Sequence, residues 1–146
     1  MLQTGLLRMG GAGVALIASL ILGMPAMAQT VNLKADLKGS NEVPPNTTTG
    51  SGAMTGTYDP ASKKLTWTIT YTGMTTPPSA GHFHGPAERD KNAGIVVPYN
   101  PPLTSPIRGE ATLTDAQAND LLAGRWYVNL HTPAHPGGEL RGQVMK

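Results

Sequence analysis

Hydrophobic and polar residues alternate along most of the chain after residue 29. Val31, Leu33, Ala35 and Leu37 are separated by polar residues, and residues 65–71 combine β-branched and aromatic side chains in the same rhythm. A period of two is typical of strands that bury one face. We therefore expect eight short strands, over residues 31–37, 52–58, 65–71, 80–84, 94–97, 107–113, 126–132 and 139–145.

A single helix is predicted between the sixth and seventh of these strands. Thr114 and Gln117 have the spacing of a capping box, Leu121 supplies an apolar contact, and Gly124 gives a stop signal. Eight strands with Gly- and Pro-containing turns and one short helix predict an all-β fold. The expected architecture is one antiparallel Greek-key β-sandwich, resembling immunoglobulin-like or superoxide-dismutase-like sandwiches.

The first 28 residues have the composition of a signal peptide. Arg8 is their only charge, an uncharged stretch of small and apolar residues follows, and Ala26-Met27-Ala28 matches a cleavage motif. The apolar stretch is short for a membrane span, so no anchor is expected after cleavage. The sequence thus predicts a signal peptide over residues 1–28 and one domain over 29–146, periplasmic or secreted.

Composition narrows the chemistry of that domain. Its acidic and basic residues nearly balance, with 11 Lys and Arg against 9 Asp and Glu in the whole chain, so no nucleic-acid partner is expected. The chain has no Cys. A disulfide, a Cys nucleophile and a thiolate metal site are therefore excluded. No catalytic residue is predicted, because no nucleophilic triad is recognisable.

All four histidines fall into two tight groups. His82 and His84 flank Phe83, and His131 and His135 are separated by three residues. If Phe83 packs inward, His82 and His84 point outward together, and His131 lies on the outer face of its own strand. All four imidazoles converge on one face if the two strands are neighbours, which the sequence alone leaves open.

Imidazoles without thiolates suit copper, zinc or nickel, and copper has the highest intrinsic affinity. The sequence therefore predicts a copper site at His82, His84, His131 and His135, with zinc or no metal as the alternatives. Metal uptake is expected to be lost below about pH 6, where imidazoles protonate. In the alternative interpretation these histidines form a structural polar cluster, and His135 lies in an exposed turn.

Two charged residues next to the second histidine group have two interpretations. Glu139 and Arg141 alternate along the last predicted strand and are expected on the face opposite Leu140. They are predicted either to orient a ligating imidazole from the second shell or to form a solvated cross-strand salt bridge.

Three stretches of the chain resemble the CHRD domain, named for its occurrence in the secreted antagonist chordin. They are residues 37–45, residues 80–87, and residues 121–132 together with 136–144. The resemblance implies an exported β-sandwich with a His-x-His strand and a closing His-Thr block. His82, His84 and His131 match that pattern, and His135 falls in a more variable link. The resemblance implies binding rather than an established reaction.

Three functions are compatible with these patterns. The first is an exported metal-binding module whose partner is a metal ion, copper above all. The second is a protein-interaction or matrix module, whose partner is another protein and whose histidines are structural. The third is a copper-only enzyme resembling superoxide dismutase, although the additional zinc ligands and the disulfide of that family are missing here.

Overall fold

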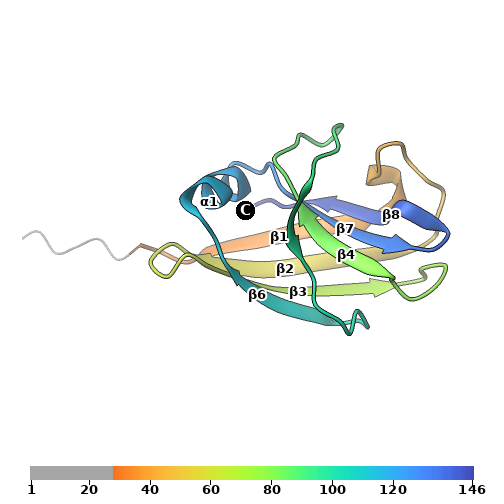
Figure 1. Ribbon diagram of the computed structural model, residues 1–146, viewed down its shortest axis with the longest axis horizontal. Helices are drawn as coiled ribbons and strands as arrows, with labels where there is room; N and C mark the ends of the chain where they lie inside the picture. Colours follow the sequence, from red (N-terminus) through yellow and green to blue (C-terminus); the bar gives the residue numbers. More distant parts are fainter. Residues whose placement is uncertain (1–27) are drawn as a thin grey trace, which may run out of the picture.

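The computed structural model describes residues 28–146 and confirms the predicted all-β fold (Figure 1). The predicted signal peptide lies outside the described residues, apart from Ala28. The strands are β1 (Val31–Lys38), β2 (Ser51–Asp59), β3 (Lys64–Thr72), β4 (Ala80–His84), β5 (Ile95–Pro98), β6 (Ile107–Thr112), β7 (Tyr127–Thr132) and β8 (His135–Gln143). A short 3-10 helix, η1 (Gly39–Asn41), follows β1, and one α-helix, α1 (Asp115–Leu122), precedes β7.

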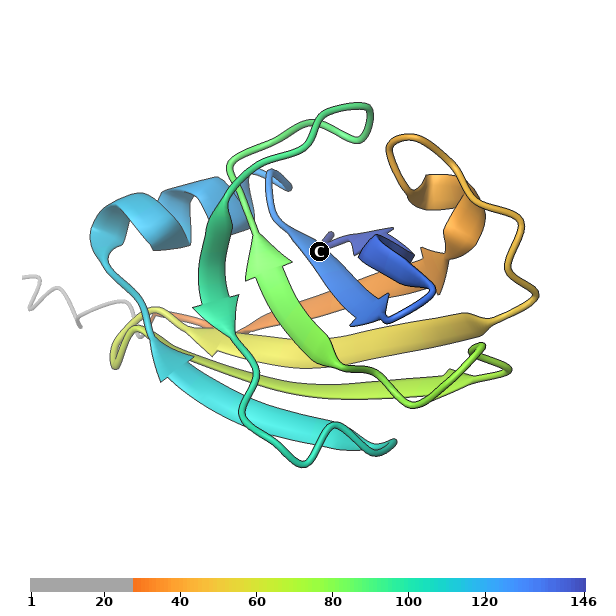
Figure 2. The same cartoon turned by 45° about the vertical axis from the view of Figure 1, so that its right-hand side comes forward.

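The eight strands form one antiparallel sheet in the order β5-β4-β7-β8-β1-β2-β3-β6. The sheet folds over, so that β1, β2, β3 and β6 lie in one layer and β4, β5, β7 and β8 in the other (Figures 1 and 2). The two layers join where Lys38 of β1 pairs with Arg141 of β8. The chain crosses between the layers after β3, β5 and β6. The predicted sandwich with crossing connections is thus present.

Aromatic side chains fill the space between the layers. The ring of Phe83 in β4 meets that of Trp67 in β3 edge-on, with centroids 5.1 Å apart. Tyr99 and Trp126 pack against the same Phe83 ring. Edge-to-face contacts of this kind stabilise a core beyond the area they bury. Phe83 is fully buried, as predicted, and this orientation places its neighbours in β4 on the opposite face.

Helix α1 begins and ends at the predicted signals. The Thr114 hydroxyl accepts from the backbone N–H of Gln117, and the Gln117 side chain accepts from the backbone N–H of Thr114. This reciprocal capping satisfies two donors that the first turn leaves free. Gly124 ends the segment with a φ of +73°, and the chain then enters β7.

The last strand differs from the prediction. β8 begins at His135 rather than at Glu139, and its pairing with β7 is irregular between Leu130 and Thr132. Residues 136–139 of β8 lie opposite His131 alone in β7, and within this stretch Gly138 adopts a φ of +130°. The alternation of polar and apolar residues cannot predict such an insertion, because a prediction from alternation treats the pairing of the two strands as regular.

The outer face of β7 and β8 is also less exposed than the alternation predicts. Four of its residues are buried, namely Tyr127, Asn129, Arg141 and Gln143. The segments 39–50 and 85–94 rise above this side of the sheet (Figure 2). They are tied together by a hydrogen bond of 2.8 Å from the Asn92 side chain to the Val43 carbonyl. These two segments therefore form a second polar interior outside the main core.

Candidate metal centre

Pairing between β4 and β7 brings three of the four histidines together. The strands are antiparallel neighbours, with Ala80 opposite His131 and His82 opposite Asn129. This arrangement places the side chains of His82, His84 and His131 on one face of the sheet. One ring nitrogen from each lies within 4.8 Å of the others. The neighbouring strands on which convergence depends are therefore confirmed for these three residues.

Backbone carbonyls fix the orientation of two of the rings. Nδ1 of His84 lies 2.9 Å from the Ala93 carbonyl, and Nδ1 of His131 lies 2.9 Å from the Pro136 carbonyl. A carbonyl oxygen only accepts hydrogen bonds, so both Nδ1 atoms carry the proton when these rings are neutral. Their Nε2 atoms are then left with free lone pairs. Carbonyls that hold Nδ1–H in this way are common around metal-ligating histidines.

The third ring, that of His82, hydrogen-bonds to one of these two histidines. Nδ1 of His82 lies 3.2 Å from Nε2 of His131. Since Nε2 of neutral His131 has no proton, His82 is the donor. Nε2 of His84 is buried and has no hydrogen-bond partner among residues 28–146. A buried polar atom without a partner is rare in folded proteins, and a metal ion would satisfy this one.

The spacing of these nitrogens suits a metal ion after a small adjustment. Two ligands at 2.0–2.1 Å in tetrahedral geometry lie about 3.3 Å apart. The His82 and His131 nitrogens already have that separation, at 3.2 Å. The widest pair in the cluster lies within 4.8 Å and would have to close by no more than roughly 1.5 Å.

The surroundings keep the three imidazoles neutral. Burial, together with the neighbouring His131 and His84 rings, lowers the pKa of His82 to about 4. Burial also lowers the pKa of His84 and of His131, although the carbonyl contacts oppose it in both cases. Neutral imidazole is the form that binds metal ions.

His135, the fourth predicted ligand, lies outside this cluster. It is partly buried at the start of β8, where it pairs with Thr132. The sequence gives no means of separating it from the other three, because the irregular pairing of β7 with β8 decides where it lies.

Neither interpretation of Glu139 matches its surroundings. Glu139 is fully buried and contacts three threonines instead of a histidine or Arg141, accepting from the hydroxyls of Thr48, Thr75 and Thr132 at 2.6–2.7 Å. Burial alone would raise the pKa of Glu139, but these hydrogen bonds lower it to about 2. The predicted solvated salt bridge is therefore wrong, because the irregular stretch of β8 turns Glu139 away from Arg141.

Arg141 is buried as well, and its guanidinium bonds to the 85–94 segment. It also lies over the ring of Tyr127, 3.6 Å from the centroid. His84 pairs with Tyr127 across β4 and β7, and the two rings are parallel with centroids 5.0 Å apart. Sequence reasoning missed Tyr127, Ala93 and Pro136, and the carbonyl roles of Ala93 and Pro136 have no signature in a sequence.

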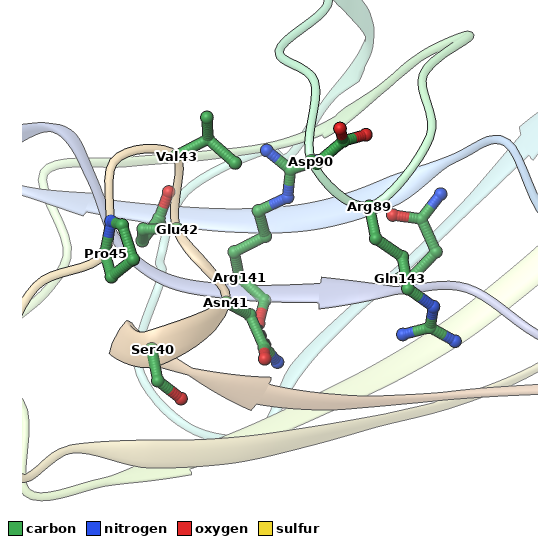
Figure 3. Close-up of a pocket in the computed structure, with 9 residues that line it drawn as sticks. All are labelled: Ser40, Asn41, Glu42, Val43, Pro45, Arg89, Asp90, Arg141 and Gln143. Atoms are coloured by element: carbon green, nitrogen blue, oxygen red, sulfur yellow. Dashed lines mark hydrogen bonds between the residues drawn. The ribbon is translucent and has the colours of Figure 1, made fainter.

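Beside Arg141 lies a pocket of about 410 Å³ between η1, β8 and the 85–94 segment. Glu42, Arg141 and Gln143 contribute to its wall, and Arg89 and Asp90 lie at the side formed by the 85–94 segment (Figure 3). None of the three clustered histidines lines this pocket. The pocket and the histidine cluster are separate features, connected through the buried side chains of β7 and β8.

These features define a β-sandwich with a three-histidine cluster on one face. A family model for the CHRD domain matches residues 33–144, and the chain belongs to the CHRD domain family. No curated protein and no solved structure matches the chain. Within residues 28–146, no helix has the length and apolar character needed to span a membrane. Family membership supports a binding role, and the histidine geometry indicates which ligand chemistry to test.

Proposed function

We propose that this protein is an exported CHRD-domain module that binds a transition metal ion through His82, His84 and His131. The observation that carries the proposal is the convergence of three imidazole nitrogens within 4.8 Å. Two of the rings hold Nδ1–H against a carbonyl, which leaves their Nε2 atoms unprotonated. Metal binding replaces one hydrogen bond, between His82 and His131, and keeps both carbonyl contacts.

Copper is the proposed metal. Imidazole nitrogen suits zinc, copper and nickel, and Cu(II) binds most tightly to a given set of such ligands. Zinc is the alternative, since three histidines with an open fourth position are also a known zinc arrangement. The cluster contains no Asp or Glu that would favour a harder ion.

The low pKa of His82 changes the pH range expected for metal binding. Protons compete with a metal only near or below the imidazole pKa. Because burial and mutual repulsion lower that pKa, we expect binding to persist below pH 6, the limit expected from an ordinary imidazole.

Export is part of the proposal. Residues 1–28 have the composition of a cleaved signal peptide, and the first strand begins at Val31, just after the expected cleavage point. The mature protein from a bacterial culture should therefore begin at Gln29. Its intact mass checks this, and a mass that retains the first 28 residues would contradict cleavage.

Calorimetric titration tests the metal site directly. Metal-free protein comprising residues 29–146 is titrated with Cu(II) and then with Zn(II), beside a His82→Gln/His84→Gln variant and a His135→Gln control. We expect one equivalent of Cu(II) per chain in the wild type and in the control. The double variant should bind more than about 100-fold more weakly, since losing ligands exceeds the effect of losing outer-shell partners.

Equal, weak binding by all three proteins would contradict the proposal and favour the protein-interaction alternative. One observation supports that alternative, namely that His82 already hydrogen-bonds to His131, and that His84 and His131 each hydrogen-bond to a backbone carbonyl. In that case the double variant should lose stability in urea although the wild type takes up no metal.

A further inference from the structure

Arg141 is a buried cation whose partners are mostly backbone carbonyls. Its side chain is 1% exposed, and no carboxylate lies within ion-pair distance among the described residues. The guanidinium donates to Oδ1 of Asn92 at 2.9 Å and to the carbonyls of Lys91 and Glu88 at 2.6 and 3.3 Å. A buried charge is tolerated only with such partners. Arg141 therefore fastens the 85–94 segment to β8 at three points.

The same segment supplies the acceptor that orients His84. Ala93 directly follows Asn92, and its carbonyl accepts from Nδ1 of His84 at 2.9 Å. The Tyr127 hydroxyl accepts from the Ala93 N–H at 3.0 Å and donates to the Ala93 carbonyl at 3.3 Å. The backbone of Ala93, held on both sides by Tyr127, thus supplies the acceptor for Nδ1 of His84.

Arg141 also reaches His84 by a second route through Tyr127. The guanidinium carbon lies 3.6 Å from the centroid of the Tyr127 ring. The ring of His84 is nearly parallel to that of Tyr127, at an interplanar angle of 4°. Contact with an aromatic face favours a planar cation such as guanidinium over an ammonium group. The Tyr127 ring thus lies against both the Arg141 guanidinium and the His84 ring.

We propose that Arg141 is a positioning residue for His84. It holds the 85–94 segment so that the Ala93 carbonyl keeps the proton on Nδ1 and Nε2 of His84 stays free beside His82 and His131. The consequence for metal affinity rests on the proposed function, whereas the effect on the tautomer holds for the metal-free protein.

The tautomer is read from the ¹⁵N chemical shifts of the His84 ring in metal-free protein comprising residues 29–146. In the wild type we expect Nδ1 protonated and Nε2 unprotonated. Arg141→Lys keeps the charge but loses the fork that reaches three acceptors and the flat contact with Tyr127. We expect this variant to show a mixture of both tautomers, and its affinity for Zn(II) to fall about 10–100-fold.

Arg89→Lys is the matched control. Arg89 lies in the same segment and beside the same pocket, but it is exposed and its side chain makes no hydrogen bond or ion pair within the described structure. We expect the wild-type tautomer and the wild-type Zn(II) affinity. If Arg141→Lys behaves like this control in both measurements, the proposal is overturned.

A second variant keeps the test decisive if Arg141→Lys does not fold. Asn92→Ala changes an exposed residue and removes one acceptor of Arg141 together with the bond to Val43. We expect faster hydrogen exchange of the Ala93 amide and a partial tautomer shift in His84. If both are unchanged, the proposal fails.

The outcomes for the two proposals can be told apart. If Arg141→Lys shifts the tautomer of His84 but the wild-type protein binds no metal, the positioning role stands and the proposed metal function is wrong.

Discussion

At the scale of single residues, Glu42 is a buried carboxyl group with few partners to stabilise its negative charge. It is 6% exposed, and its carboxylate accepts one side-chain hydrogen bond, from the Asn129 amide. Burial raises the pKa of Glu42 to about 7, although the Asn129 bond and the charge of Arg141 oppose this. The folded state therefore binds a proton at Glu42 more tightly than the unfolded chain, whose Glu pKa is near 4.5.

We expect Glu42→Gln to stabilise the protein above neutral pH. A raised folded-state pKa contributes stability below pH 4.5 that is lost as the pH rises through 7, because ionisation is easier in the unfolded chain. Gln cannot ionise and still accepts from Asn129, so this loss should disappear. Urea unfolding should show a gain of roughly 2–3 kcal/mol at pH 8 and little change at pH 4.

Glu88→Gln, at an exposed glutamate, is the control for this measurement. It should change the free energy of unfolding by less than about 0.5 kcal/mol at either pH. A Glu42→Gln protein no more stable than wild type at pH 8 would show that the folded state does not raise the pKa of Glu42.

At the scale of elements, the irregular start of β8 decides which polar residues reach the histidine cluster. It carries the Pro136 carbonyl to His131 and turns Glu139 towards Thr132. Two adjacent glycines, Gly137 and Gly138, occupy this stretch, and only Gly138 has a positive φ. The sequence shows both glycines, but the backbone conformation that distinguishes them depends on how β8 pairs with β7.

We expect Gly138→Ala to destabilise the protein and Gly137→Ala to have little effect. At Gly138 an added Cβ would lie 2.5 Å from Oε1 of Glu42 and 2.6 Å from the Asn129 amide, at a φ of +130°. At Gly137 an added Cβ meets nothing within 4 Å. Backbone strain and these contacts should cost Gly138→Ala more than about 2 kcal/mol in urea unfolding.

The paired variants give a clear contrast, since both make the same chemical change at adjacent positions. Gly137→Ala should remain within about 0.5 kcal/mol of wild type. Equal stability of the two variants would mean that the irregular start of β8 relaxes freely and does not fix its neighbours.

At the scale of the whole molecule, alternation predicts much of the fold, because each layer has one face in the aromatic core. Phe83 and Leu130 are buried as their patterns require, and this orientation leaves the histidines on the outer face. The pairing of β4 with β7 is not encoded locally, since the paired segments lie far apart in the chain. The burial of Arg141 was also missed, because the 39–50 and 85–94 segments that cover it have no periodicity.

The proposed metal site links segments that are distant in the chain, so metal binding should raise the stability of the whole domain. His82 and His131 are 49 residues apart and come together only when β4 pairs with β7. A ligand that binds only the folded state stabilises it by about 2.7 kcal/mol at a free concentration 100 times its Kd. For a domain of this size, that corresponds to a rise of roughly 10 °C in the midpoint of thermal unfolding.

Calorimetric scans of residues 29–146 with and without Zn(II) measure this rise while avoiding the redox chemistry of copper. His135→Gln should keep the full shift, because His135 lies outside the three-histidine cluster. His131→Gln should lose most of it, since one strand then supplies no ligand to the cluster. An equal rise in His131→Gln would mean that zinc binds elsewhere, and no rise in the wild type would mean that the cluster does not hold zinc in the folded state.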